Sequence, residues 1–223
     1  MVDHEPELPD ELDTTRRVGR PRRLSVGEIV TAAIELADDQ GLDGLSMPKL
    51  AKRLGVGTMT LYGYVESKED LLDRIAERIF ERLRAPVEGG WRDGMRGFFS
   101  DFREAALAHP TLAHLLATGR ITIPAVFDIL ETFFRQMTDD GLEIETAVRA
   151  FYAGLTYTIG FVLWEIPRTQ SQTELDYAAQ WAHLVGQLDE SAYPLLTGPA
   201  APIAPTVAST AQFEWGLERV LLG

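Results

Sequence analysis

The sequence predicts an all-α fold, and three observations support that prediction. Residues typical of helix starts and helix ends punctuate the chain from residue 24 onward. Between them, apolar residues repeat at the 3.6-residue period of an α-helix. The 223 residues are 45% hydrophobic, which is enough to build a substantial core.

The first predicted helix spans residues 26–40. Ser25 and Glu28 have the spacing of a capping box, in which each residue satisfies a free backbone N–H at the start of the helix. Gly41 is a suitable terminating residue because glycine adopts the left-handed conformation without strain. The apolar face of this helix is formed by Ile29, Ala33, Leu36 and Ala37.

Three further helices are expected before residue 86. Ser46 is a natural N-cap for a short second helix that has Pro48 in its first turn and stops at Gly55. A third short helix is expected over Thr58 to Val65. Ser67 then caps a long fourth helix that ends near Arg84 and Pro86 and carries an apolar stripe of Leu72, Ile75, Ile79 and Leu83.

The third helix lacks the full apolar face of a core helix and also lacks the charges of a solvated one. Two short helices joined by a Gly-Val-Gly turn are typical of a helix-turn-helix. In that arrangement Leu61 and Val65 anchor the third helix, while Thr58, Met59 and Thr60 face outward toward a major groove. The alternative is a small three-helix packing module with incidental surface threonines, because this geometry also occurs in proteins that bind no DNA.

Charge is distributed unevenly along the chain, whose net charge is -13. Residues 1–13 hold six acidic and no basic residues, whereas residues 16–23, RRVGRPRR, hold five arginines and no acid. The Gly19-Arg20-Pro21 element keeps the backbone extended, so Arg20, Arg22 and Arg23 can reach a phosphate backbone or a minor groove. The alternative is a solvated arm without a partner.

The second half predicts a larger helical domain. Helices are expected from Trp91 to Ala108, in a short segment after Pro110, from Pro124 to near Gly141, over 143–165, and from Thr206 to Leu222. The 143–165 helix is too apolar to face water, so the last helix is expected to pair with it across a two-fold axis as a four-helix bundle. Burial within one monomer is the alternative. Residues 189–205 are expected to form a loop.

Residues 24–72, above all GLDGLSMPKLAKRLGVGTMTLYGYVESKEDLL, resemble the N-terminal domain of the TetR family of bacterial transcriptional regulators. The family's Leu61-Tyr62 pair and Ser67-Lys68 step carry the resemblance. More weakly, the second half is similar to the C-terminal domain of tetracycline repressors at Trp91, His109, Asp140-Gly141, Gly160 to Leu163 and the closing FEWGLERVL. The implied division is an acidic tail and arm over 1–23, a helix-turn-helix DNA-binding domain over 24–70, and an effector-binding and dimerisation domain over 71–223.

The resemblance implies a homodimer that binds a palindromic operator in double-stranded DNA. It places Tyr62, Tyr64 and Lys68 on phosphates and the 58–60 stretch, Thr58, Met59 and Thr60, at base edges. Ser46 and Lys49 are plausible backbone contacts, although a helix cap and a solvated lysine explain them equally well. Pro48 and Gly63 stand where the tetracycline repressors have a base-reading arginine and a bulky aromatic residue, so the resemblance does not extend to their operator.

The resemblance also implies an effector pocket in the second domain. Its residues, matched position by position, are Arg84, Phe98, Phe102, Leu116, Phe133, Phe151, Thr156 and Trp164. Leu116 and Trp164 replace the magnesium-site residues of the tetracycline repressors, and His114 and Glu165 are displaced from those positions. We therefore expect a small hydrophobic or aromatic effector bound without metal or cofactor, although core packing explains each aromatic residue taken singly.

Other protein classes fit the sequence poorly. The four histidines are scattered, there is no HExxH motif or Gly-rich phosphate loop, and the chain has no cysteine, so no catalytic residues and no enzyme activity are expected. No segment is long and apolar enough for a membrane span, and the acidic N-terminus does not resemble a signal peptide, which predicts a cytoplasmic protein. The remaining alternative is a dimeric DNA-binding regulator that is controlled by a protein partner instead of an effector.

Overall fold

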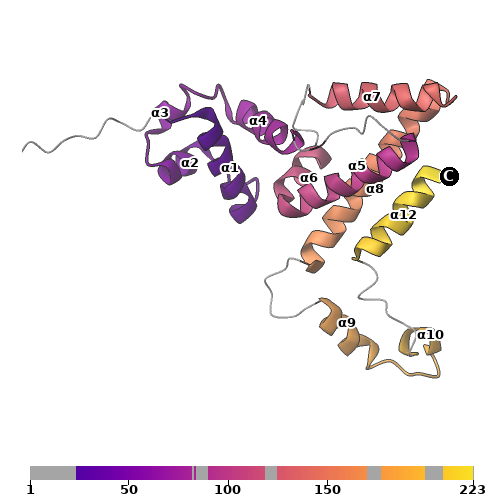
Figure 1. The fold of residues 1–223 in the computed structure, drawn as a ribbon. Helices are drawn as coiled ribbons and strands as arrows, with labels where there is room; N and C mark the ends of the chain where they lie inside the picture. Colours follow the sequence, from indigo (N-terminus) through magenta and orange to yellow (C-terminus); the bar gives the residue numbers. More distant parts are fainter. Residues whose placement is uncertain are drawn as a thin grey trace, which may run out of the picture.

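The computed structural model describes residues 24–81, 83, 90–118, 125–169, 177–198 and 208–222. All regular secondary structure in these segments is helical, which confirms the all-α prediction. Figure 1 shows two parts, a small head at one end and a larger body at the other. We call residues 24–81 the head, and residues 90–118, 125–169 and 208–222 the body. No helix in the described part of the chain is long and apolar enough to cross a membrane.

The head contains α1 (Val26–Gln40), α2 (Met47–Leu54), α3 (Thr58–Leu61) and α4 (Lys68–Phe80). The predicted capping box is present, because Glu28 N donates to Ser25 Oγ at 3.2 Å and Ser25 N donates to the Glu28 carboxylate at 2.9 Å. Gly55 ends α2 in the left-handed conformation with φ of 69°, which a side chain would strain. Helix α1 packs against α2 and α4, and their buried apolar residues form the core of the head.

Helix α3 is shorter than the sequence predicted. It ends at Leu61 and is followed by a turn over residues 62–64, whereas a helix was expected to continue to Val65. The backbone tightens there, since Gly63 N donates to Thr60 O and Tyr64 N donates to Leu61 O, each three residues back. Leu61 and Val65 are nevertheless both buried, as the anchoring role required. The turn lets both apolar side chains reach the core without a second helical turn.

The body is built around α8 (Ile144–Thr169), which packs against α5 (Trp91–Ala108), α6 (Pro110–Ala117), α7 (Ala125–Asp139) and α12 (Thr210–Leu222). The sequence predicted that α8 would end at residue 165, but the helix continues past Pro167. A proline lacks the N–H donor and its ring crowds the carbonyl four residues back, so it disfavours the last turn, yet the helix continues to Thr169. Arg168 supports this turn by donating from Nη1 to Trp164 O at 2.6 Å.

Two helices were not predicted. They are α9 (Tyr177–Val185) and the single turn α10 (Pro194–Thr197), which lie apart from the body in Figure 1. Helix α10 falls inside the predicted 189–205 loop, and Pro194 starts it because the fixed φ of proline suits the first helical position. The predicted start of the last helix at Thr206 lies outside the described residues, and the described helix begins at Thr210.

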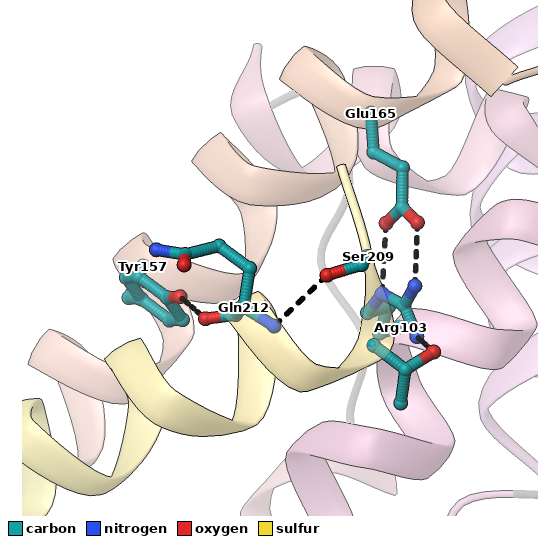
Figure 2. Close-up of polar contacts among 6 residues, drawn as sticks. Arg103, Tyr157, Glu165, Ser209 and Gln212 are labelled. Atoms are coloured by element: carbon teal, nitrogen blue, oxygen red, sulfur yellow. Dashed lines mark hydrogen bonds and ion pairs between the residues drawn. The ribbon is translucent and has the colours of Figure 1, made fainter. Parts of the chain in front are cut away.

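Within the body, Arg103 pairs with a buried carboxylate and also bonds to α12, and α12 lies in close contact with α8. Arg103 on α5 donates to Glu165 on α8 from Nε at 2.7 Å and from Nη2 at 2.5 Å, and its Nη1 donates to Thr210 Oγ1 at 3.3 Å. Figure 2 shows this arrangement, with Tyr157 donating to the backbone of α12 nearby. Because a Cβ on Gly216 would overlap the Tyr157 hydroxyl, only glycine allows α12 to approach α8 this closely.

Candidate DNA-binding surface and effector pocket

The outer surface of the head at α3 carries exposed apolar and hydroxyl side chains. Met59 is 81% exposed and Tyr62 is 45% exposed, although both are large and apolar in their bodies. Thr60 is exposed beside Met59, whereas Thr58 and Tyr64 are half-buried. The predicted base-reading stretch and Tyr62 thus share one solvent-facing surface, and a surface of this kind points to a macromolecular partner.

The cations around this surface are positioned by contacts within the head. Lys49 Nζ donates to Gln40 Oε1 at 3.0 Å, and Lys68 Nζ donates to the backbone oxygen of Leu42 at 3.4 Å. Both side chains keep N–H donors that could bind phosphate oxygens, because an ammonium group has three. The Ser46 hydroxyl accepts from Lys49 N at 3.5 Å, so Ser46 acts at least as the cap of α2.

Arg53 near the end of α2 is bound by carboxylates. Its Nη2 lies 2.8 Å from Glu35 and its Nη1 lies 3.2 Å from Asp39, both on α1. These hydrogen bonds, first that of Glu35 and then that of Asp39, raise the pKa of the Arg53 guanidinium above its ordinary value. The guanidinium of Arg53 therefore joins α2 to α1.

Arg20, Arg22 and Arg23 of the predicted arm and Arg84 of the predicted pocket lie outside the described residues. Their roles remain predictions.

Three of the predicted pocket residues form an aromatic cluster in the body. Phe98 on α5, Phe133 on α7 and Phe151 on α8 lie with ring centroids 5.3 to 6.1 Å apart, and Phe99 joins them at 5.3 Å from Phe98. All four are buried. Such spacings are typical of favourable aromatic packing, so in this conformation the rings fill the space between α5, α7 and α8.

Phe102, another predicted pocket residue, faces the head. Its ring centroid lies 6.0 Å from that of Phe80, the last residue of α4. Both side chains are buried. The aromatic core of the body therefore continues through α5 to the end of the helix that carries the head.

The remaining predicted pocket residues lie away from the cluster. Leu116 is half-buried on α6, and Thr156 is exposed on α8. Trp164 is 49% exposed, with the Arg168 guanidinium 3.3 Å from its ring centroid.

No metal site is visible in the described part of the chain, where no group of three or more His, Asp or Glu side chains could hold a metal ion. His114 is exposed and bonds to Pro110 O, and Glu165 is buried against Arg103. His114 and Glu165 are thus held by other contacts, and neither makes a metal site with the side chains of Leu116 and Trp164.

Two features were missed from the sequence. The first is Arg103, which lies on the apolar face of α5 beside Phe99 and Phe102, a position whose charge could have signalled a buried partner. Burial raises the pKa of the neighbouring Tyr157 phenol, and the Arg103 charge opposes that rise. The side chains of this cluster hold α5, α8 and α12 together.

The second missed feature is the contact between head and body. His109, between α5 and α6, lies with Nδ1 2.9 Å from Asp38 Oδ2 on the last turn of α1. Beside it is a hollow of about 660 Å³ whose lining includes Ile34 on α1, Ile79 on α4 and Asp101 on α5. Helix α6 also packs against both α1 and α4. A shift of α6 would therefore reach the head directly.

Comparisons with known proteins agree with this architecture. The family model described as bacterial regulatory proteins of the tetR family matches residues 29–75, and the model of the tetracycline repressor-like C-terminal domain matches residues 84–223. The class D tetracycline repressor of Escherichia coli is 32% identical over 207 residues, which cover 90% of this chain and 89% of that protein.

Two solved structures are similar to this chain in their three-dimensional fold. The Streptomyces coelicolor TetR family protein ActR in complex with actinorhodin has a TM-score of 0.74 and 27% identity, covering 91% of this chain and 95% of its own. BioQ with its double-stranded DNA operator has a TM-score of 0.57 and 26% identity, covering 66% of this chain and 91% of its own. The chain belongs to the TetR family, whose members are transcriptional regulators and not enzymes.

Proposed function

We propose that this protein is a cytoplasmic transcriptional repressor that binds a palindromic operator as a homodimer and is released by a small hydrophobic or aromatic effector. The observation that carries the proposal is the solvent-facing surface at α3, where Met59 and Tyr62 are exposed on a rigid helical head. A soluble domain has no internal use for such a surface, and a major groove is wide enough to receive it.

DNA contacts are divided between two sets of residues in this proposal. Tyr62, Tyr64 and Lys68 bind phosphates and set the register of the head, with Ser46 and Lys49 on α2 as further backbone contacts. Thr58, Met59 and Thr60 meet base edges. The arm residues Arg20, Arg22 and Arg23 add contacts to phosphates or to the adjacent minor groove. We assign DNA binding to residues 24–70 and effector binding and dimerisation to residues 71–223, with α4 as the link.

The outer surface of α8 and α12 supports the homodimer. Tyr152, Thr156, Gly160 and Trp164 recur along one exposed stripe of α8, and Trp215 is exposed on the neighbouring α12. The space around Gly160 is open, so a second helix could approach closely there. A second copy would bury this apolar stripe across a two-fold axis, and a palindromic operator requires that symmetry.

The aromatic cluster supports an effector site. Effector binding between Phe98, Phe133 and Phe151 would move α5 and α8 apart, and the Phe102–Phe80 contact would pass the movement to α4. A tilt of α4 changes the separation of the two recognition helices from the roughly 34–36 Å that adjacent major grooves require. The tetracycline repressor, ActR with actinorhodin and BioQ with its operator provide parallels for both kinds of ligand.

The test of DNA binding is an anisotropy titration on the DNA upstream of the protein's own gene, at two salt concentrations. We expect a sequence-selective complex whose affinity falls with salt, because phosphate contacts release counterions. Tyr62→Phe removes one hydroxyl and should weaken binding to all sequences alike. Equal affinity for a scrambled duplex of the same composition would contradict the proposal.

Effector control is tested separately by thermal unfolding with a panel of small aromatic compounds. A compound that raises Tm and lowers operator affinity supports the proposal, since a ligand stabilises the state that it binds. Phe133→Ala should abolish the shift while leaving operator binding in place. If no compound shifts Tm but operator binding is selective, control by a protein partner is the better explanation.

A further inference from the structure

The chemistry of the head restricts which bases it can read. Guanine is read in the major groove by Arg or Lys, adenine by Asn or Gln, and cytosine by Asp or Glu. Residues 54–65, LGVGTMTLYGYV, contain none of these six residue types. Helix α3 and its flanking turns therefore have no side chain that could make a bidentate hydrogen bond to a base.

Arg53 is the residue of α2 best suited to read a base, but its contacts do not favour that role. The Arg53 guanidinium is held by Glu35 at 2.8 Å and by Asp39 at 3.2 Å, so it would have to leave these two carboxylates before it could present both edges of its fork to a base. Pro48 is exposed in the first turn of α2 and has no polar side chain. Lys49 and Lys52 are exposed and are the remaining candidates for reading guanine from α2, but each is a compact charge on a flexible stem without the rigid fork of an arginine.

The exposed side chains of α3 include a large apolar one. Met59 is 81% exposed, and the exposed Thr60 next to it carries a methyl group. In the major groove the apolar feature that distinguishes one base from the others is the thymine C5-methyl group. A flexible thioether can follow the position of a methyl group closely and exclude water from it.

We propose that the head selects its operator by apolar contact between Met59, assisted by Thr60, and thymine methyl groups, without bidentate hydrogen bonding to any base. The inference rests on the proposed DNA-binding function and specifies its substrate as half-sites with thymine at the positions that face α3. Each methyl contact adds only a modest preference for thymine over the other bases. Two half-sites and the phosphate contacts together supply the affinity.

The experiment begins with selection of operator duplexes from a random library by the full chain. In the selected duplex each thymine is then replaced in turn by deoxyuracil, which deletes one methyl group and leaves base pairing intact. We expect one or two positions per half-site at which the replacement weakens binding about fourfold, the effect of losing one buried methyl group. Replacing the equivalent thymine in both half-sites should weaken binding about fifteenfold.

Substitutions at Met59 test whether this side chain causes the loss of affinity on deoxyuracil replacement. Met59→Ala should bind thymine and deoxyuracil duplexes equally, whereas the conservative Met59→Leu should keep part of the discrimination. The side chain is exposed, so neither substitution should change the thermal unfolding of the free protein. Thr60→Ser, which removes only a methyl group, should reduce discrimination at a neighbouring position. Lys49→Met serves as the matched control, because loss of a proposed phosphate donor should weaken all duplexes equally.

The possible outcomes distinguish failure of the DNA-binding function from failure of methyl reading by Met59. If selection yields no inverted repeat, the DNA-binding function itself is wrong. If an operator is selected but deoxyuracil has no effect at any position, or the effect persists in Met59→Ala, methyl reading by Met59 is wrong. A consensus fixed at guanine whose recognition is lost in Lys52→Met would show that α2 is the reader.

Discussion

The head and the body each contain an ion-paired arginine, Arg53 and Arg103, and the two lie in opposite environments. In the head, Arg53 is 36% exposed and its partner Glu35 is 55% exposed, whereas in the body Arg103 and Glu165 are 8% and 4% exposed. An exposed pair adds at most about 1 kcal/mol, because water screens it. A buried pair has lost its hydration, so each charge depends on the other. The pair of the head can therefore be changed at little cost in stability, while the body needs its buried pair in order to pack.

Breaking the buried pair should have the largest effect. Arg103→Met leaves the Glu165 carboxylate buried without its bidentate partner, and we expect a loss of about 3–5 kcal/mol of unfolding free energy. Urea unfolding measures this loss. The double variant Arg103→Met/Glu165→Leu should recover most of the stability, since no charge is left uncompensated. A double variant as unstable as the single one would show that the guanidinium packing against Phe213, not its charge, is what matters.

Adding one methyl group at Gly216 should have the next largest effect. Gly216→Ala places a Cβ against the ring of Tyr157, which is packed on Phe213 at 5.7 Å and donates to Phe213 O at 3.1 Å. We expect a loss of about 1–3 kcal/mol from overpacking, measured by urea unfolding. If α12 forms the dimer interface, sedimentation equilibrium should also show weaker association. The exposed Gly160→Ala gives the comparison for the unfolding free energy alone, because its Cβ meets no atom of its own chain but lies on the proposed dimer stripe.

The contact between the two regions should have an intermediate effect. Asp38→Ala removes the acceptor 2.9 Å from His109 Nδ1, and we expect a loss of about 1 kcal/mol, the usual contribution of one such hydrogen bond. The more informative effect of Asp38→Ala should be a less fixed orientation of the head relative to the body. The chain has no native cysteine, so Lys52→Cys can carry a spin label, and the distance distribution between labels in the proposed dimer should broaden. An unchanged distribution would mean that apolar packing alone orients the head.

Removing the exposed pair of the head should have the smallest effect. Arg53→Met loses contacts to Glu35 and Asp39, yet we expect less than about 1 kcal/mol because both carboxylates can return to water. The difference from the wild type should shrink further in 1 M salt. A loss as large as that in Arg103→Met would overturn the comparison between the regions.

The sequence by itself determined the features that depend on near neighbours. The capping box at Ser25, the left-handed Gly55 and the apolar periods of α1 and α4 are local, so the helices and the helix-turn-helix of the head followed from residues a few positions apart. The mixed composition of the 58–60 stretch likewise predicted an exposed surface. That prediction needed no knowledge of the rest of the fold.

Only the tertiary structure decided the rest, because it depends on residues far apart in the chain. Arg103 meets Glu165 across 62 positions and Thr210 across 107, and no local pattern reports such a contact. The same holds for the predicted pocket, where Phe98 and Phe151 came together but Trp164 turned to the surface beside Arg168. A helical period fixes which residues share a face. What that face meets is set by the packing of the other helices.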